Sequence, residues 1–404
     1  MQGSALRRCV AVDESRFLTS YWGSRPLLSP AERLPTGFTD LLDLPGVDDL
    51  LSRRGLRTPF LRVARDGRVV PADRYTGSGG AGAEIADQVL DERVLALYED
   101  GATLVLQGLH RLWPPVVDFA GALAGQLRHP VQVNAYLTPP GNRGFAAHYD
   151  THDVFVLQVA GAKRWRVHPP VVPDPLERQP WGGVADEVAA SADTPPALDV
   201  VLRPGDALYL PRGWLHSAQA LGEQSLHLTV GVRTITRYAL VEALLDLAAE
   251  EPRLRRSVPP GVEVADPDQV ADELAATVEA LRDWLTKADP VAVAERLRRR
   301  YWAASRPAPI RPVAQAAAVR AVDGDTRLAV RPGLRWRLVD TAPDRVAVQV
   351  FDRSLDVPSF CAPALRALLA GEVSRVADLP GLDRDDQVTL ARRLLREAFV
   401  VPAR

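Results

Sequence analysis

Three side chains in the middle of the chain have types and spacing that suit a transition-metal site. His148 and Asp150 are separated by one residue, and His216 follows 66 residues after Asp150. In an extended strand, residues i and i+2 point to the same face, so His148 and Asp150 would aim an imidazole and a carboxylate at one point. Two histidines and one carboxylate leave open coordination positions on a metal, which is the arrangement of non-haem iron(II) oxygenases.

A His-x-Asp pair by itself is weak evidence for a metal site, because short motifs over-predict and most such pairs are structural or lie on the surface. The context adds support. Residues 205–216 read as a turn, a strand, a second turn and then His216, an order that could return a third ligand to the mouth of a barrel. His152 is a rival ligand because it shares strand parity with the pair, and we expect it behind the ligands or against a substrate.

The remaining histidines are expected to be structural. His110 and His129 flank the first predicted barrel strands, and His227 reads as a core histidine whose ring nitrogens are satisfied. His168 shares a strand face with two arginines, so we expect it to point outward.

Lysine is rare in this chain, since only Lys163 and Lys287 occur among 49 basic residues. Lys163 follows a Gly-Ala turn and shares its face of a predicted strand with Trp165 and Val167, so it would point inward. It could snorkel from the end of a barrel to solvent. Alternatively, its compact charge could form a salt bridge with the distal carboxylate of 2-oxoglutarate at the base of a pocket.

The segment Val131–Thr138 alternates between an apolar face and a face that carries Gln132, Asn134, Tyr136 and Thr138. The polar face could be the solvent side of an antiparallel sheet, which is the usual case, or it could line a wet cavity. In a cavity, Asn134 and Tyr136 would suit hydrogen bonds to a carboxylate or to a metal-bound ligand.

The barrel that these residues need is indicated between residues 101 and 235, where short β-type runs alternate with turn signals and few helices. A long irregular insertion, Val171–Pro196, reads as a surface loop or lid. The predicted strands are Ala102–Gln107, Val131–Thr138, Asp153–Val159, Lys163–His168, Ala207–Leu210 and Leu226–Ile235.

Helical segments flank the predicted barrel. Residues 1–100 read as mixed helix and loop, and residues 236–303 read as helices, followed by a proline-rich linker at 306–312. Short strands and helices between 313 and 404 are the ingredients of a winged helix. The predicted helices are Phe17–Trp22, Leu41–Leu51, Glu84–Tyr98, Tyr238–Ala249, Val270–Leu285, Val291–Trp302, Ala362–Leu369 and Asp385–Glu397.

Composition indicates a globular protein without a strong electrostatic preference. The 404 residues are 47% apolar and 25% charged, and the formal net charge of −2 gives no general attraction to nucleic acid or anionic membranes. Two distant cysteines, the lack of a long apolar run at the start and the lack of any membrane-length apolar stretch lead us to expect a cytoplasmic protein without a membrane partner.

Five motifs occur in a fixed order: Phe17–Leu28, Asn134–Gly141, His148–Asp153, Gly161–Trp165 and Gly205–His216. On these motifs the chain resembles the JmjC-type, cupin-like ribosomal oxygenases. The order of elements extends the resemblance over nearly the whole chain. It implies an α+β protein with a supporting region at 1–100, a JmjC double-stranded β-helix (a cupin jelly roll) at 101–235, a helical dimerisation region at 236–308 and a winged-helix-like domain at 309–404.

The same resemblance implies the chemistry of the site. His148, Asp150 and His216 match the iron(II) ligands of the family, and Lys163 matches the lysine that holds the carboxylate of the co-substrate 2-oxoglutarate. Asn134 and Tyr136 match residues that line the same pocket. Some relatives carry a hydroxyl residue on the last barrel strand, where our register places Gly231; Thr229 or Ser225 could take its place.

Three hypotheses follow. The first is a dioxygenase that hydroxylates a protein side chain, Arg or His of a ribosomal protein, and acts as a homodimer. The second is an oxygenase of a small molecule or peptide natural product. The third is a non-catalytic cupin-like binding or regulatory protein, against which the intact metal motif and Lys163 argue. Between residues 309 and 404, 15 arginines nearly balance 12 acidic residues, so we expect a docking or dimer-supporting module there rather than a nucleic-acid partner.

Overall fold

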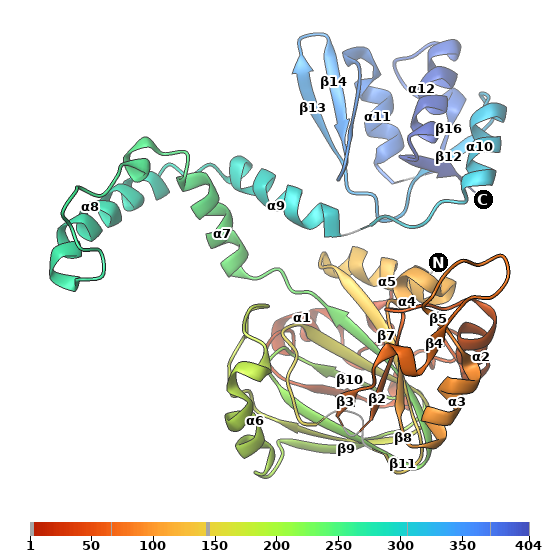
Figure 1. The fold of residues 1–404 in the computed structure, drawn as a ribbon. Coiled ribbons are helices and arrows are strands. Elements are labelled where there is room, and N and C mark those ends of the chain that lie inside the picture. The colour runs from red at the N-terminus through yellow and green to blue at the C-terminus, as the bar shows by residue number, and fades with distance from the viewer. Residues whose placement is uncertain (1–3, 66, 143–145, 305, 372, 404) are drawn as a thin grey trace. The chain divides into compact units, whose positions relative to one another are not determined.

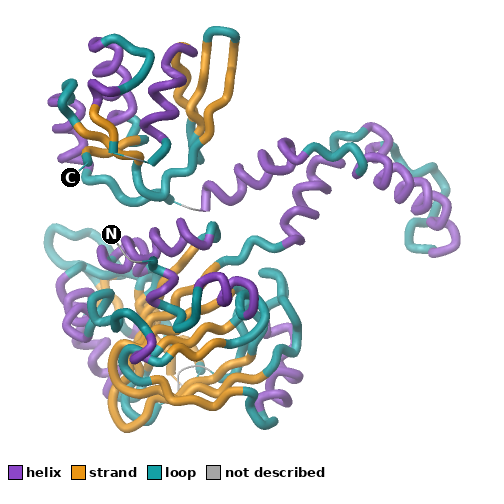
Figure 2. The backbone as a smooth tube through the Cα atoms, turned by 180° about the vertical axis from the view of Figure 1, so that it is seen from behind, coloured by secondary structure: helices purple, strands orange, loops and turns teal. Residues whose placement is uncertain are grey.

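The computed structural model describes residues 4–65, 67–142, 146–304, 306–371 and 373–403. Its contacts divide into two compact units, Met1–Thr234 and Ile235–Arg404. The first unit is built on an antiparallel sheet that curls into a barrel with helices on its outside, as the ribbon in Figure 1 and the tube in Figure 2 both show. The mixture of helices and a strand-built barrel predicted from the sequence is therefore confirmed.

The sheet follows the order β1-β10-β8-β11-β7-β6-β2-β3, and β9 pairs with β8 off this path. A separate hairpin is formed by β4 and β5. The strands are β1 Leu27–Ser29, β2 Leu61–Arg65, β3 Arg68–Val69, β4 Thr76–Gly77, β5 Gln88–Val89, β6 Thr103–Leu106, β7 Val131–Thr138, β8 Asp153–His168, β9 Leu198–Leu202, β10 Ala207–Leu210 and β11 Leu215–Val232. The helices are α1 Glu14–Ser20, α2 Leu44–Arg53, α3 Asp91–Glu99, α4 Leu109–Leu112, α5 Pro114–Leu127 and α6 Ala185–Ala192.

The long strands β8 and β11 contribute to both walls of the barrel because each bends near its middle. The first half of β8 pairs with β10 and its second half with β9, so the two strands predicted from the sequence are one continuous strand. β11 pairs with β8 along its length, with a register shift between Leu221 and Leu226. The bend requires Gly161, where φ is +63° and an added Cβ would lie 2.0 Å from the carbonyl oxygen of Gln224.

Alternation along the strands separates two apolar clusters. Phe155 and Leu228 belong to the larger cluster, which also takes in Phe17 of α1 and so joins the sheet to its covering helices. Their strand neighbours Val154 and Val156 belong to a smaller cluster, and both also line a pocket. The pocket therefore lies on the inner face of the barrel, and its walls are held from behind by the larger core.

Two expectations about the first unit are wrong. The helix predicted at Glu84–Tyr98 begins only at Asp91, because residues 88–89 pair with β4 instead. The insertion Val171–Pro196 is not wholly irregular, since it contains a 3₁₀ turn at Trp181–Val184 and the helix α6, whose Val188 is buried. Helix α5 was not predicted at all, although two prolines in its first turn suit a helix start.

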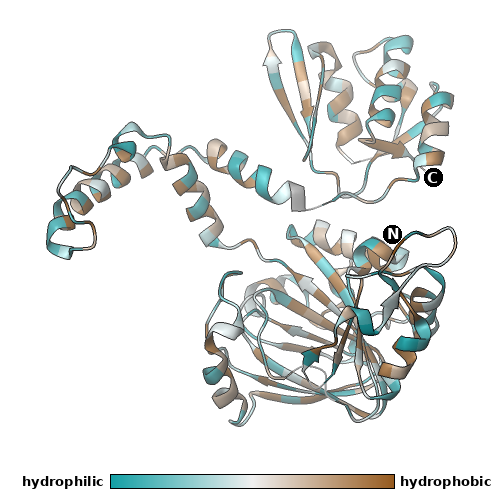
Figure 3. Ribbon diagram, viewed as in Figure 1, coloured by the Kyte–Doolittle hydropathy of each residue, from teal (hydrophilic) through white to brown (hydrophobic). Residues whose placement is uncertain are grey.

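The second unit contains three long helices, α7 Arg237–Ala248, α8 Pro267–Leu285 and α9 Pro290–Ala304, followed by a small mixed domain. In that domain α11 packs against strand β12 and contributes buried residues to a core of its own. Figure 3 shows that α11 is rich in hydrophobic positions. Its elements are α10 Pro312–Ala321, β12 Arg327–Val330, β13 Arg337–Ala342, β14 Arg345–Gln349, β15 Ser354–Pro358, α11 Ala362–Leu369, β16 Ser374–Arg375, α12 Arg384–Arg396 and β17 Val400–Pro402. None of the helices in the described ranges is long and apolar enough to cross a membrane.

Candidate metal centre and its pocket

The two predicted histidine ligands are fastened to each other by their backbones. His148 donates its N–H to the carbonyl oxygen of His216 at 3.2 Å, and His216 donates to the carbonyl oxygen of His148 at 2.8 Å. This antiparallel bridge lies just before β8 and at the start of β11, and it brings the imidazole centroids to 4.5 Å. The bridge explains how residues 68 positions apart in sequence come to share one site.

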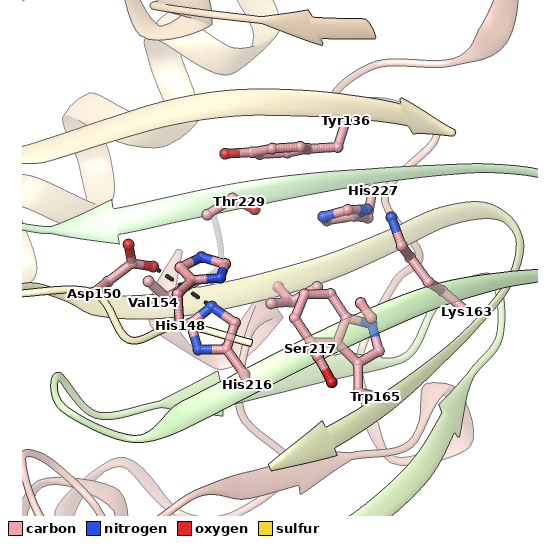
Figure 4. Close-up of a pocket in the computed structure, with 12 residues that line it drawn as sticks. Tyr136, His148, Asp150, Val154, Lys163, Trp165, His216, Ser217, His227 and Thr229 are labelled. Carbon is pink, nitrogen blue, oxygen red and sulfur yellow. Dashed lines mark ion pairs between the residues drawn. The ribbon is translucent and has the colours of Figure 1, made fainter. Parts of the chain in front are cut away.

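The ligand atoms of His148, Asp150 and His216 all lie within 4.8 Å of one another. Figure 4 shows Asp150 facing His216, with 3.8 Å between Oδ2 and Nε2. His148 donates from Nδ1 to the Ala146 carbonyl oxygen at 2.8 Å. His216 donates in the same way to the Trp214 carbonyl oxygen at 3.1 Å. Because a carbonyl oxygen can only accept, these bonds favour the neutral tautomer with its proton on Nδ1, in which the Nε2 lone pair is available to a metal.

The protonation states around this cluster also suit a cation. Burial acts to raise the pKa of Asp150, but the neighbouring His152, His216 and His148 outweigh it and hold that pKa below its usual value. Burial lowers the pKa of His216 to about 4, and His148 adds to this effect. Near neutral pH the site therefore offers an ionised carboxylate and a neutral imidazole, and a divalent metal needs no proton to leave these two groups.

A buried carboxylate that the sequence analysis did not single out positions the turn before His216. Asp153 accepts from the Tyr209 hydroxyl at 2.6 Å and from the Arg212 backbone N–H at 3.0 Å. The Gly213 N–H donates to the Asp150 carbonyl oxygen at 3.0 Å. These bonds tie the turn to the segment that carries the other two ligands, and the final Asp of the His148–Asp153 motif was the available signal.

Lys163 points into the barrel, as its alternation with Trp165 predicted. It is 2% exposed, and its Nζ donates to the Thr138 hydroxyl at 3.0 Å. Burial lowers the pKa of Lys163 to about 7. No Asp or Glu among the described residues forms an ion pair with it, so a buried amine faces the pocket without an anionic partner in that part of the chain.

Aromatic side chains complete the pocket between Lys163 and the metal cluster. His227 stacks on Tyr136 with ring centroids 5.0 Å apart, and the edge of Trp165 meets His227 at 5.5 Å (Figure 4). Within the described residues, Nδ1 of His227 and Nε1 of Trp165 are buried without a hydrogen-bond partner. His227 is thus buried as expected, but it is a pocket residue with an unsatisfied nitrogen rather than a satisfied core histidine.

Tyr136 and Asn134 lie on the same strand face, as predicted, but in different surroundings. Tyr136 lines the pocket, and burial raises the pKa of its hydroxyl to about 12. The Asn134 Oδ1 accepts from the Gly108 N–H at 3.0 Å, and its side chain hydrogen-bonds Tyr136. Asn134 is not among the residues that line the pocket, so its contact with a co-substrate stays a prediction.

The hydroxyl on the last barrel strand is resolved by the register. Thr229 lines the pocket, whereas Ser225 accepts a hydrogen bond from Gln158 at 2.9 Å. A side chain at Gly231 would displace the ring of His152, because an added Cβ would lie 2.7 Å from Nε2 of that ring. Of the two substitutes considered, Thr229 is therefore the one placed to reach a bound molecule.

The other histidines follow the predictions with one exception. His152 lies outside the metal cluster, and its Nε2 is 3.5 Å from Nε2 of Gln132. His110 accepts a hydrogen bond from the Val133 backbone N–H, and His129 stacks on the indole of Trp22. His168 does not point into solvent, since it is only 2% exposed. Its strand partner Leu215 packs with Val188 of the insertion, which covers this end of the sheet.

Comparisons with known proteins find a domain match within the barrel. A family model described as a JmjC domain matches residues 118–240. Residues 118–240 are therefore similar to a JmjC domain. The matched segment contains the three clustered side chains and Lys163, and the resemblance proposed from the sequence is confirmed.

Relatives of the JmjC domain carry oxygenase names. The chain is 31% identical over 263 residues to "Bifunctional lysine-specific demethylase and histidyl-hydroxylase NO66" of Aedes aegypti, covering 60% of this chain and 38% of that protein. It is 33% identical over 208 residues to human "Ribosomal oxygenase 1", covering 48% of this chain and 31% of that protein. The chain thus spans about a third of the length of these curated relatives.

Among solved structures, the Escherichia coli ribosomal oxygenase YcfD matches 97% of this chain and 98% of its own, with a TM-score of 0.53 and 20% identity. A second YcfD structure, in complex with cobalt and 2-oxoglutarate, matches with a TM-score of 0.51 and 19% identity. At this identity the likeness concerns the fold.

We predict that His148→Ala and Asp150→Ala each abolish tight binding of a divalent metal, because each removes one of three converging ligands. The loss should exceed the roughly 10–100-fold that follows removal of a residue behind the ligands. Titration of the metal-free protein with Co²⁺, followed by its visible absorption, measures this. His152→Ala is the matched control and should bind within that smaller range; a loss as large as that of His148→Ala would make His152 a ligand.

Proposed function

We propose that this chain is an iron(II)- and 2-oxoglutarate-dependent dioxygenase that hydroxylates a side chain of a protein, an arginine or histidine of a ribosomal protein. The observation that carries the proposal is the convergence of two histidines and one aspartate beside a buried lysine that lacks an anionic partner among the described residues. A metal cluster alone fits many chemistries. The buried lysine beside the cluster indicates a metal enzyme that also binds a carboxylate-bearing molecule.

The residues present fit both groups. His148, Asp150 and His216 would hold iron on one face and leave positions for oxygen and for the co-substrate. Lys163 and Thr138 would hold the distal carboxylate of 2-oxoglutarate, and the unpartnered nitrogens of His227 and Trp165 border the same space. Bound iron supplies the chemistry by which O₂ oxidises 2-oxoglutarate to succinate and CO₂ while one oxygen atom enters a C–H bond.

The chain's own part is positioning and exclusion of water. The backbone bridge fixes the two histidines, and the stacked rings of Tyr136 and His227 line the pocket that also contains Lys163 and the metal cluster. The ring of Trp181, from the insertion, lies 6.4 Å from that of His148. These contacts would limit the orientations open to a bound dicarboxylate.

The test of the proposed function is formation of succinate that depends on added Fe²⁺ and 2-oxoglutarate, together with a gain of one oxygen in a ribosomal protein. Ribosomal proteins from cells lacking the gene are incubated with the purified chain and examined by intact-mass spectrometry. We expect a single protein to gain one oxygen, and Asp150→Ala to give none. Succinate without any modified ribosomal protein would favour the small-molecule or peptide alternative, and no succinate at all would favour a non-catalytic role.

Lys163 should make co-substrate binding depend on pH. Its pKa is about 7 in the unliganded pocket, and a bound carboxylate favours the charged amine and raises that pKa. Below pH 7 the amine is already protonated, so binding takes up no proton. Above pH 7 binding must take up a proton, and affinity for 2-oxoglutarate should fall by up to about tenfold per pH unit.

Calorimetry of 2-oxoglutarate binding to the Co²⁺-loaded protein, from about pH 6.5 to about pH 9, measures this pH dependence. Lys163→Met should bind more weakly at pH 7 and lose the pH dependence, whereas Lys287→Met, the other lysine and an exposed one, should behave as wild type. His227 and Tyr136 face the same space. Burial lowers the pKa of His227 well below its usual value and raises that of Tyr136 to about 12, so neither group titrates in this range. Equal pH slopes in both variants would remove Lys163 from the pocket.

We further propose that helices α7–α9 form a homodimer interface. Helix α8 has no buried residue in the described chain, and Leu274, Val278 and Leu285 form one stripe that is 42–56% exposed. Unpartnered apolar stripes on helices usually mark subunit contacts, and a second copy is the commonest partner.

Light scattering should give twice the chain mass for the wild type. A variant with Leu274→Glu and Val278→Glu should be monomeric, because it places charges within the stripe, while Ala276→Glu on the opposite face should remain dimeric. A monomeric wild type would refute the dimer.

We propose supporting roles for the remaining domains. Residues 309–404 would form a winged-helix-like docking module without a nucleic-acid role, since their arginines and acidic residues nearly balance. Residues 1–100 would support the barrel, and the protein would act in the cytoplasm, where ribosomal proteins are made.

A further inference from the structure

A second hollow lies away from the metal centre, between helices α2 and α3, which run along the same side of the first unit (Figure 1). Its apolar lining comes from both helices and from the strands beneath them. Val47, Val94 and Leu104 are buried in its floor, and Leu95 is 60% exposed at its side. This groove is lined by Leu44, Val47, Asp48, Leu51, Ser52, Asp91, Glu92, Val94, Leu95, Tyr98, Glu99, Leu104, Leu137 and Gln224.

The charged residues of the groove are all acidic. Asp48 on α2 and Asp91, Glu92 and Glu99 on α3 line it, and no lysine or arginine does. None of these four carboxylates forms an ion pair with another described residue, although the chain carries 49 basic residues. The carboxylates of nearby Asp49 and Asp87, by contrast, are each held by an arginine. The groove therefore presents uncompensated negative charge beside exposed apolar surface.

The position of Glu99 argues against a purely local role. It lies in the last turn of α3, which contains no basic residue, and a carboxylate there opposes the helix dipole. Asp91 and Glu92 suit the first turn of the same helix, so the dipole explains these two but not Glu99. A carboxylate that costs helix stability at an apolar groove is consistent with attraction of a cation from outside the chain.

We infer that the α2–α3 groove is a docking site for a cationic protein segment that also carries large apolar side chains. The acidic rim repels nucleic acid and anionic lipid, and the apolar floor gives a small cation nothing to bind, so charge complementarity selects a basic amphipathic peptide. The inference rests on the proposed function in one respect: the segment belongs to the basic protein that is modified. Docking there would retain that protein while its target side chain enters the barrel.

The probe is a labelled amphipathic peptide of arginines and leucines, and the measurement is fluorescence anisotropy with the full-length protein. We expect binding that weakens as salt is raised. The variant Asp48→Asn, Glu92→Gln, Glu99→Gln should bind on the order of tenfold more weakly, since each lost surface charge pair contributes modestly. Leu95→Ser should also weaken binding, and because Leu95 is exposed its folding should not suffer.

The matched control removes the same amount of charge elsewhere. Asp118→Asn, Asp193→Asn, Glu279→Gln neutralises three exposed carboxylates outside the groove and should bind the peptide as wild type does. Thermal melting confirms that all variants fold. Wild-type protein that does not bind the peptide, or equal weakening in the groove and control variants, overturns the inference. If the groove variant alters the oligomeric mass but not peptide binding, the occupant is a second copy of this chain and the inference is wrong.

The outcome is separable from that of the proposed function. Asp150→Ala should lose turnover and keep peptide binding. Peptide binding through the groove by a protein that never forms succinate would leave the docking site standing and refute the dioxygenase.

Discussion

The candidate site depends on one backbone interaction, the pair of hydrogen bonds between His148 and His216. Side-chain rotation can adjust a ligand by an ångström or two, but it cannot bring together strands that do not pair. The bridge makes the distance between the two imidazoles a property of the backbone, and Asp153 fixes the turn that leads into it. The barrel thus holds the three donor groups in place before any metal arrives, so little ordering remains when one binds.

The pocket behind the metal cluster contains buried polar groups that lack full hydrogen-bonding or charge partners. Burial of Lys163 destabilises its charged form, and the single hydrogen bond to Thr138 compensates only in part. A lysine in this condition gains more from an anionic ligand than an exposed lysine would, because the ligand removes a cost that the folded protein already carries. The unsatisfied nitrogens of His227 and Trp165 carry a similar cost in the same space. Local instability of the unliganded pocket is therefore part of what makes binding favourable.

Sequence patterns located what depends on local spacing. The period of two placed Lys163 with Trp165 and Tyr136 with Thr138, and each pair does share a face of its strand. His148 and Asp150 converge as expected, but they precede β8 and do not lie in a regular strand. The pairing of strands that are far apart in the sequence could not be predicted from local spacing. The bend at Gly161 joins two predicted strands into one, and the stacking of His227 on Tyr136 follows from the pairing of β11 with β7. The prediction for His168 was wrong because the insertion that follows it, which reads as a surface loop, folds back over this end of the sheet through Val188.

Charge balance in the proposed complex suggests an order of events. Without a metal, the ionised Asp150 repels a dicarboxylate, and Lys163 at the far end of the pocket attracts it. A divalent ion reverses the sign of the metal end, so that both ends of the pocket then attract carboxylates. With the metal and 2-oxoglutarate in place, the charges of Asp150, the ion, the dicarboxylate and protonated Lys163 cancel. A buried site is most stable near neutrality, so the fully loaded pocket is the favourable state and metal binding should precede that of the co-substrate.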